Sequence, residues 1–322
     1  MRTGTLAAAA IAVMALCGAP RAEAQQRHAV LVFGAAGSEQ YERTHSGWRE
    51  QLVEALEQHL AFDAERVVVL SADAADPGLR STSENVRRVF ESLRGRAAPE
   101  DVVLVLLVGH GTNDGETAKF NLVGPDLDAE EWGALVDAVP GRLVFVNSTA
   151  ASFPFLARLS KPGRIVITAT DSAAQRYATV FPDVLVRTLT DPATDLDRNG
   201  RVSWWEVFTQ VSAGVRQHYE QRGQLATERP LLDDTGDGLG QEAGAPGTNG
   251  AMARTTYLDA DPLARTDDPV LLELLARQRE LEAQAEALKL RKPTLSPAEW
   301  ELQFEELMIE LARVARAVRS RS

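Results

Sequence analysis

The stretch VVLVLLVGHG, Val102 to Gly111, decides the fold class that the sequence predicts. Seven consecutive apolar residues lead into Gly109, so we expect a strand that is buried on both of its faces. Strands of this kind belong to parallel sheets that carry helices on either side. His110 follows directly and stands between two glycines, which places an imidazole at the end of the expected strand.

Similar apolar runs recur along the chain and alternate with amphipathic patterns. Strands are expected at residues 28–34, 66–70, 102–109, 143–147 and 164–170, and helices at 48–60, 83–94, 128–139, 180–189 and 204–219. Alternation of continuous apolar strands with helices indicates the α/β class. The sequence therefore predicts a doubly wound, mostly parallel sheet flanked by helices, in a domain that spans residues 25–238.

The C-terminal third has a different composition. Residues 239–267 are rich in glycine, which predicts a flexible linker. In residues 268–322 apolar side chains follow heptad spacing, first Leu274, Leu281 and Leu288, then Trp300, Phe304, Leu307, Leu311, Val314 and Val318. We expect an antiparallel, coiled-coil-like helical hairpin. It either packs on itself and on the α/β domain, or offers a surface for a protein partner or for self-association.

The first 24 residues have the pattern of a secretory signal peptide. Arg2 precedes an apolar stretch of about ten residues, and Ala22 to Ala24 forms an A-x-A cleavage site. A lipid anchor on Cys17 is the alternative, although bulky Leu16 stands where a small residue is usual. We expect an exported protein, periplasmic or extracellular in a bacterium, without a membrane span, because no apolar stretch is long enough to cross a bilayer.

Charge and cysteine content exclude two classes of function. The net charge is −12, and removal of Arg2, Arg21 and Glu23 with the signal peptide takes away +1, which leaves −13. Such a chain repels nucleic acid, so no nucleic-acid partner is expected. Cys17 is the only cysteine, so the exported chain has neither a disulfide nor a thiol nucleophile.

Polar residues also end the next expected strand, in LVFVNSTAASF, Leu143 to Phe153. The carboxyl ends of parallel strands share one edge of a sheet, where ligands and catalytic groups gather. His110 is thereby brought toward Ser148 and Thr149. An imidazole can act as a general base and a hydroxyl as a nucleophile, so these three are the candidate catalytic residues.

In their order and spacing, several segments resemble the caspase-like cysteine peptidases, above all the legumain-like group and its bacterial relatives. The segments are AVLVFGAAGSEQYERTHSGW (29–48), VLLVGHGTNDG (105–115), LVFVNST (143–149), VITATDSAAQRY (166–177) and ERPLLDDTGDG (228–238). The resemblance covers roughly residues 28–238 and leaves out the hairpin. It implies a caspase-like fold, a substrate cleft, His110 as the catalytic histidine and Arg43 as a substrate-binding residue.

The chain departs from that family at the nucleophile. Active members end the strand with an acidic residue, a small residue and cysteine, but here Thr149 stands at the cysteine position, or Ser148 if the register slips by one. A hydroxyl needs a hydrogen-bonded and oriented base to attack. The pattern therefore favours an inert, peptidase-like binding or scaffold module with a protein or peptide ligand in its cleft. The alternative is an active hydrolase that uses Ser148 or Thr149 with His110.

A second motif, DLDRNGRVSWWE, matches the twelve-residue calcium loop of an EF-hand. The ligand positions fall on Asp195, Asp197, Asn199, Arg201 (through its carbonyl), Ser203 and Glu206, with Gly200 at the sharp turn. The alternative is a helix start in which Ser203 is the N-cap and Glu206 closes a capping box. That reading leaves Asp195 and Asp197 unexplained. Bound Ca²⁺ would also allow a purely structural role, as a calcium-stabilised exported domain.

Overall fold

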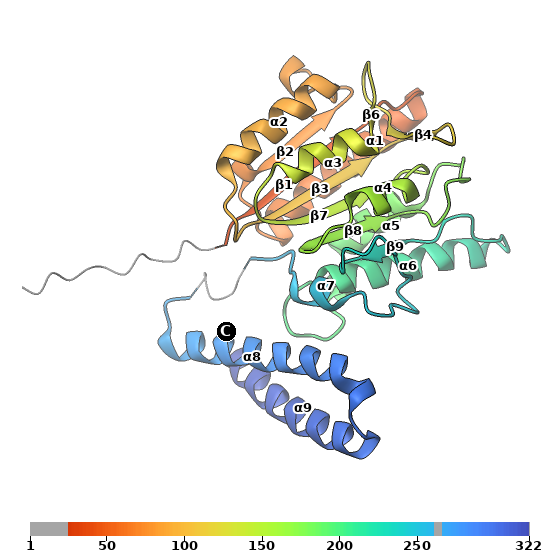
Figure 1. The fold of residues 1–322 in the computed structure, drawn as a ribbon. Coiled ribbons are helices and arrows are strands. Elements are labelled where there is room, and N and C mark those ends of the chain that lie inside the picture. The colour runs from red at the N-terminus through yellow and green to blue at the C-terminus, as the bar shows by residue number, and fades with distance from the viewer. Residues whose placement is uncertain (1–24, 261–265, 322) are drawn as a thin grey trace, which may run out of the picture.

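The computed structural model describes residues 25–260 and 266–321 and has a layered α/β architecture (Figure 1). A six-stranded sheet has the order β2-β1-β3-β7-β8-β9. Its strands are β1 (Arg27–Phe33), β2 (Val67–Ser71), β3 (Val102–Val108), β7 (Arg142–Asn147), β8 (Arg164–Thr168) and β9 (Leu231–Asp233). The first five are parallel, and β9 runs antiparallel to β8. The predicted fold class is confirmed.

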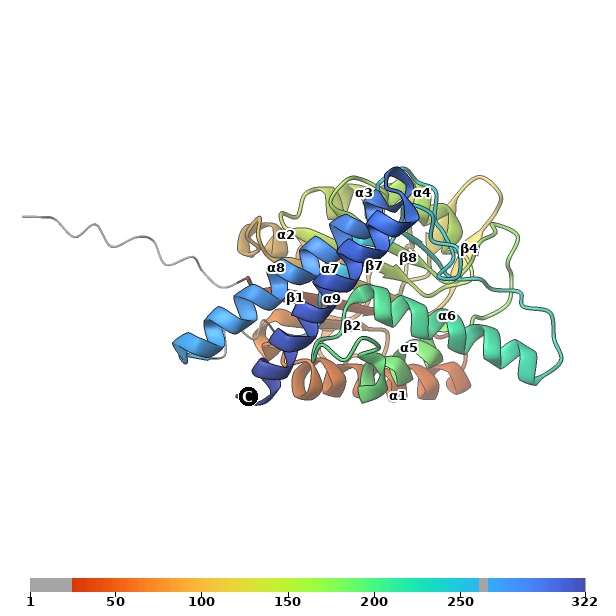
Figure 2. The same cartoon turned by 90° about the horizontal axis from the view of Figure 1, so that it is seen from below.

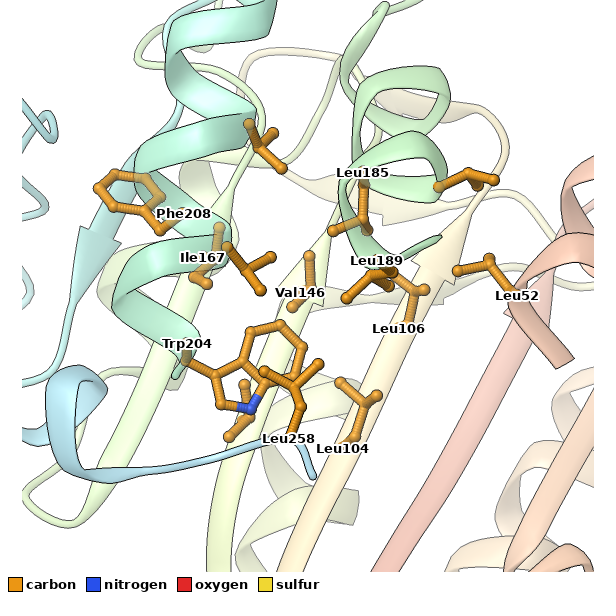
Figure 3. Close-up of a cluster of buried hydrophobic side chains, with 14 of the residues drawn as sticks. Leu52, Leu104, Leu106, Val146, Ile167, Leu185, Leu189, Trp204, Phe208 and Leu258 are labelled. Atoms are coloured by element: carbon orange, nitrogen blue, oxygen red, sulfur yellow. The ribbon is translucent and has the colours of Figure 1, made fainter. Parts of the chain in front are cut away.

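Side chains of the central strands alternate between two buried cores, one on each face of the sheet. From β3, Leu104 and Leu106 enter one core, while Val103 and Val105 enter the other. Figure 3 shows the first core, in which Leu104 and Leu106 lie among side chains of the covering helices. This two-sided burial is the reason that β3 is apolar throughout.

Helices cover both faces. The first core is covered by α1 (Glu39–Glu54), α5 (Phe181–Thr190) and α6 (Trp204–Gln221), and the second by α2 (Ser83–Arg96), α3 (Ala129–Asp137) and α4 (Phe153–Leu159). The helix α1 begins nine residues before the predicted start at Trp48, because Ser38 caps its N-terminus and its first half is polar. It continues into one π-helical turn, Ala55–His59.

Short strands after His110 form a second, three-stranded antiparallel sheet that the sequence did not predict. Its strands are β4 (Gly111–Asn113), β5 (Ala118–Phe120) and β6 (Leu127–Asp128). Strands of two or three residues are too short to produce a readable alternation of apolar and polar side chains. The same reason explains why β9 was missed.

Residues 239–260, the described part of the expected flexible linker at residues 239–267, are held in place by contacts with the rest of the chain. Gln241 exchanges two backbone hydrogen bonds with Leu232, and a short helix, α7 (Ala251–Thr255), follows. The side chain of Leu258 is 1% exposed within the first core (Figure 3). Despite its glycine content, the segment is held by a few apolar anchors and by its own backbone hydrogen bonds. Residues 261–265 lie outside the described residues.

The predicted helical hairpin is present as α8 (Pro269–Arg291) and α9 (Pro297–Arg319). Antiparallel packing is evident from contacts at both ends: Trp300 donates to the carbonyl of Leu288, and Arg321 donates to Asp268. The hairpin also rests on the α/β domain, where Tyr257 donates to Glu282 of α8 and Leu281 is fully buried. In this structure it therefore both packs on itself and docks on the domain.

Two expectations concern the ends of the chain and membranes. The predicted signal peptide, residues 1–24, lies outside the described residues. Among the helices that are described, none combines the length and the apolar character needed to cross a bilayer.

Candidate functional site

Adjacent parallel strands bring the predicted catalytic residues to one edge of the sheet. The pairing of β3 with β7 places Leu107 beside Asn147, so His110 and Thr149 both follow the carboxyl ends of neighbouring strands. A Cβ atom placed on Gly111 would lie 2.6 Å from the Oγ1 atom of Thr149. The Thr149 hydroxyl is thus pressed against the backbone of the residue that follows His110, as the strand-end argument predicts.

Neither candidate nucleophile is accessible. Ser148 and Thr149 are both 0% exposed. The hydroxyl of Ser148 donates a 2.7 Å hydrogen bond to the carbonyl of Leu107, so its proton is directed into the sheet. The Thr149 hydroxyl is buried and has no hydrogen-bond partner among the described atoms. No base therefore contacts either oxygen within the described residues, and activation of a hydroxyl requires such a contact.

Hydrogen bonds of three further hydroxyl groups hold this turn in place. Ser152 accepts hydrogen bonds from the backbone N–H groups of Ala169 and Thr170, at 3.1 and 3.2 Å, and lies 3.0 Å from the Thr170 hydroxyl. Thr170 donates to the carbonyl of Ala150, and Thr179 donates to that of Ser148. The turn is thereby tied to the end of β8. The sequence analysis missed Ser152 and Thr170, because nothing local marks two residues 18 positions apart as partners.

His110 is half-buried and packs against aromatic side chains of α1. Its ring lies 4.5 Å from that of Tyr41 in an edge-to-face arrangement and 6.0 Å from that of His45. Asp114, which follows in the same segment, accepts hydrogen bonds from the N–H groups of Glu116 and Thr117. Within residues 25–260 and 266–321, no hydrogen bond or ion pair joins a carboxylate to the His110 ring. The imidazole is accordingly placed by packing and lacks an orienting acid.

His45 lies beneath His110 and was not singled out from the sequence. It is 5% exposed and stacks on Trp48 at 5.8 Å. Burial, followed by the neighbouring charge of His110, lowers the pKa of His45 from 6.5 to about 4. His45 is therefore neutral at ordinary pH and contributes an apolar, aromatic wall.

The predicted substrate-binding residue, Arg43, is not brought to this edge. Its side chain is 73% exposed and pairs with Glu39 at 3.6 Å, one helical turn earlier on α1. Tyr41 is the residue of this turn that packs on His110. Two helical positions correspond to a rotation of about 200°, so Arg43 and Tyr41 lie on opposite sides of α1.

The predicted metal ligands form a second site before α6. Carboxylate oxygens of Asp195, Asp197 and Glu206 all lie within 4.8 Å of one another. The backbone turn that gathers them is held by Asp195, which accepts from the N–H groups of Asn199 and Gly200. Gly200 has a φ of 84°, a conformation that favours glycine. The loop spacing read from the sequence thus converges three carboxylates.

The remaining predicted ligands have other partners. Ser203 and Glu206 form the capping box of α6, so the helix-start alternative is also correct. The second oxygen of Glu206 accepts from the N–H groups of Leu196 and Asp197. Asn199 accepts from the N–H of Arg201, whose guanidinium lies over the Tyr257 ring and pairs with Asp259. The guanidinium of Arg201 is thus engaged away from the three carboxylates, and the motif assigns only its carbonyl to the metal.

Within the described residues, no ion pair balances the charge of Asp195, Asp197 and Glu206. Burial of the carboxylate, followed by the charges of Glu206 and Asp195, raises the pKa of Asp197 from 3.8 to about 6. The Asp197 residue as a whole is exposed, so solvent screens part of this repulsion. A cation bound among the three carboxylates would relieve the repulsion.

The aspartates of LLDDTGDG have structural roles. Asp233 accepts from the N–H groups of Thr235, Gly236 and Gly238. Asp234 accepts from the N–H groups of Gly250 and Ala253 at the start of α7. Both carboxylates therefore hold the backbone of the segment that follows β9.

Comparison with known proteins finds matches among solved structures. No protein-family model matches the chain, and no curated protein matches it. Among solved structures, caspase-1 from Spodoptera frugiperda is similar, with 11% identity and a TM-score of 0.41 over 66% of this chain and 87% of that one. Protein GSU0716 from Geobacter sulfurreducens is similar over 65% of this chain and 92% of that one, with 12% identity and a TM-score of 0.40. At these identities and TM-scores the likeness carries no argument about activity.

Proposed function

We propose that this chain is an exported, catalytically inert relative of the caspase- and legumain-like peptidases that acts as a binding or scaffold module. One observation supports inertness above the others: the Ser148 and Thr149 hydroxyls are 0% exposed at the nucleophile position. Burial keeps a substrate carbonyl away from both oxygens. The Ser148 proton is moreover held by the carbonyl of Leu107.

The binding role places a protein or peptide ligand at the carboxyl edge of the sheet. His110 is half-buried there beside Tyr41, and the loop after β8 exposes 72% of Tyr177. Asn113 of β4 donates to the carbonyl of Ala173 in the same loop, so the small sheet and this loop form one continuous rim. An exposed tyrosine such as Tyr177 on such a rim is typical of surfaces that bind proteins.

Replacement of Thr149 by cysteine tests inertness, in a protein whose Cys17 is changed to serine. Because position 149 is sealed, the thiol of Thr149→Cys should resist maleimide labelling in the folded protein and react after denaturation. Ala174→Cys, on the exposed loop after β8, is the matched control and should label in the native state. Rapid native labelling of Thr149→Cys, or peptide hydrolysis by the unchanged protein that His110→Ala abolishes, would contradict the proposal.

A peptide-display library panned over the purified protein tests the binding role. Selected peptides should bind the unchanged protein and lose affinity for the Tyr41→Ala and Tyr177→Ala variants. Leu225→Ala, at a side chain that is 91% exposed outside this rim, is the control. Peptides that bind all four proteins equally would place the ligand elsewhere.

We also propose that Asp195, Asp197 and Glu206 hold a calcium ion. The supporting observation is the convergence of their oxygens within 4.8 Å, in a loop whose spacing follows the EF-hand pattern. Such a cation would supply stability, with no step of catalysis assigned to it. Calorimetric titration with Ca²⁺ tests this: the unchanged protein should give binding heat that Asp197→Asn loses, and equal heats from the two would exclude the site.

A further inference from the structure

The last helix, α9, carries apolar side chains on two of its faces, and α8 covers only one of these faces. The stripe from Trp300 to Val318 is half-buried on α8, where Glu310 pairs with Arg277. No described side chain of α9 is fully buried. In Figure 1 the N-terminal half of α9 lies farther from the sheet than α8, whereas its C-terminal end returns toward the α/β domain, and Figure 2 looks onto the hairpin from below. On the other face of α9, Arg319 is the one described side chain that hydrogen-bonds outside its own helix, donating to the carbonyl of Arg198 at 3.5 Å.

That free face carries a second stripe with heptad spacing. Its members are three, four, three, four and three positions apart, so they lie along one line of the helix: Leu302, Glu305, Ile309, Ala312, Arg316 and Arg319. All six are exposed, with Leu302 at 59% and Ile309 at 45%. A shallow groove of about 460 Å³ runs beside the stripe, lined in part by Phe304, Met308 and Ile309.

The order of side chains along this stripe is self-complementary. The acidic residue Glu305 precedes the apolar centre, and the basic residue Arg316 follows it. When a second α9 is laid antiparallel with its midpoint between residues 310 and 311, Glu305 comes opposite Arg316, and Ile309 opposite Ala312. A parallel arrangement would instead oppose like charges, Glu305 to Glu305 and Arg316 to Arg316.

We propose that two copies of this protein associate through the free faces of their α9 helices, in an antiparallel and two-fold symmetric arrangement. The two hairpins then form a four-helix assembly whose new seam is a second heptad stripe. In a two-fold interface the same patch is used on both copies, and each Glu305–Arg316 contact occurs twice. Large Ile309 against small Ala312 allows the two helices to approach closely at the centre.

The side chains of Glu305 and Arg316 are available for ion pairs with a second copy. Within residues 25–260 and 266–321, no ion pair involves either side chain, so both are available to a partner. Exposed ion pairs contribute little free energy, and the apolar centre must supply most of the attraction. The charges select the antiparallel register and make association dependent on salt.

Sedimentation equilibrium of the purified protein at low ionic strength provides the first test. The unchanged protein should be a dimer in reversible exchange with monomer. Ile309→Arg should weaken self-association by on the order of 30-fold, as expected for loss of a central apolar anchor. Leu225→Arg, which alters an equally apolar and 91% exposed side chain elsewhere, should leave the dimer unchanged. Circular dichroism confirms that each variant keeps its helices.

Charge reversal provides the second test and distinguishes this surface from any other. Glu305→Arg and Arg316→Glu should each be monomeric when alone, because each then presents like charges across the seam. An equimolar mixture of the two variants should form a heterodimer, since one copy then carries arginine and the other glutamate at both positions 305 and 316. A monomeric unchanged protein, a dimer that survives Ile309→Arg, or a mixture that stays monomeric would each overturn the proposal.

Discussion

The turn at residues 147–152 and the loop at residues 195–206 look equally functional in sequence, but their structures differ in one physical respect. In the turn, the hydroxyls of Ser148 and Ser152 are committed to backbone groups inside the protein. In the loop, the carboxylates of Asp195, Asp197 and Glu206 are gathered without an ion pair to any described basic side chain. A polar motif keeps the capacity to bind when its charge is uncompensated and within reach of solvent, whereas the one hydroxyl of the turn without a partner, that of Thr149, is 0% exposed.

The turn is therefore a structural motif, whereas the loop can still bind a ligand. The buried turn contributes to the integrity of the sheet edge, and it leaves a half-buried His110 without a partner nucleophile. The acidic loop carries a repulsion that raises the pKa of Asp197 to about 6. Four measurements can break or sharpen this contrast.

Removal of the Ser152 hydroxyl should have the largest effect. Ser152→Ala leaves the buried N–H of Thr170 without its acceptor, whereas the N–H of Ala169 keeps the carbonyl of Asn147 and the Thr170 hydroxyl keeps that of Ala150. One unsatisfied buried N–H costs about 1–3 kcal/mol and each of the two other lost hydrogen bonds about 0.5–1.5 kcal/mol, so the free energy of unfolding should fall by about 3 kcal/mol. Urea denaturation measures it, with Ser172→Ala on the exposed loop as the control. A loss no larger than that of the control would mean that the turn is not held as described.

Acidification should weaken the fold through His45. Its folded-state pKa of about 4 lies below the unfolded value of 6.5, so its contribution is fully present above pH 6.5 and is lost as pH falls toward 4. The expected loss is roughly 2–3 kcal/mol. Denaturation curves for the unchanged protein and for His45→Gln, at neutral pH and at about pH 4, isolate this component. Identical pH slopes for the two proteins would contradict the assigned pKa.

Calcium should stabilise the loop by a smaller amount. At a free calcium concentration about ten times Kd, linkage predicts about 1.4 kcal/mol and a higher Tm. Asp197→Asn should abolish this response. Because the raised pKa makes ionised Asp197 unfavourable above about pH 6, the same change should also raise the Tm of the calcium-free protein at pH 8. A Tm of Asp197→Asn that still rises with calcium would place the ion elsewhere.

Replacement of Thr149 by valine should have the smallest effect. The Thr149 hydroxyl is buried and has no hydrogen-bond partner among the described atoms, and valine has nearly the same shape. The free energy of unfolding should stay within about 1 kcal/mol of the original or increase, because an unsatisfied polar group is removed. A large loss of stability would reveal a buried hydrogen bond to this oxygen.

The correct sequence predictions rest on local patterns of residues. Continuous apolar runs such as Val102–Val108 predict a two-sided parallel sheet, and strand ends place His110 and Thr149 at a common edge. The spacing of Asp195, Asp197 and Glu206 predicts that their carboxylates converge, and the heptad spacing from Trp300 to Val318 predicts the second hairpin helix. Each of these properties is written within a span of a few residues.

Contacts between distant segments explain the predictions that did not hold. Arg43 and Tyr41 are two residues apart, and only the packing of α1 on the sheet decides which of them meets His110. Likewise, Gly-rich composition at residues 239–260 suggested a linker, but Leu258 finds a place in a core built from other parts of the chain.

The fold class, the location of the strand-end motifs, the acidic loop and the helical hairpin can be predicted from the residues alone, because periodicity and turn chemistry are local. The burial of the Ser148 and Thr149 hydroxyls, the exposure of Arg43 and the uncovered face of α9 become apparent only in the folded chain. Burial depends on which surfaces meet, and those surfaces come from residues far apart in the chain.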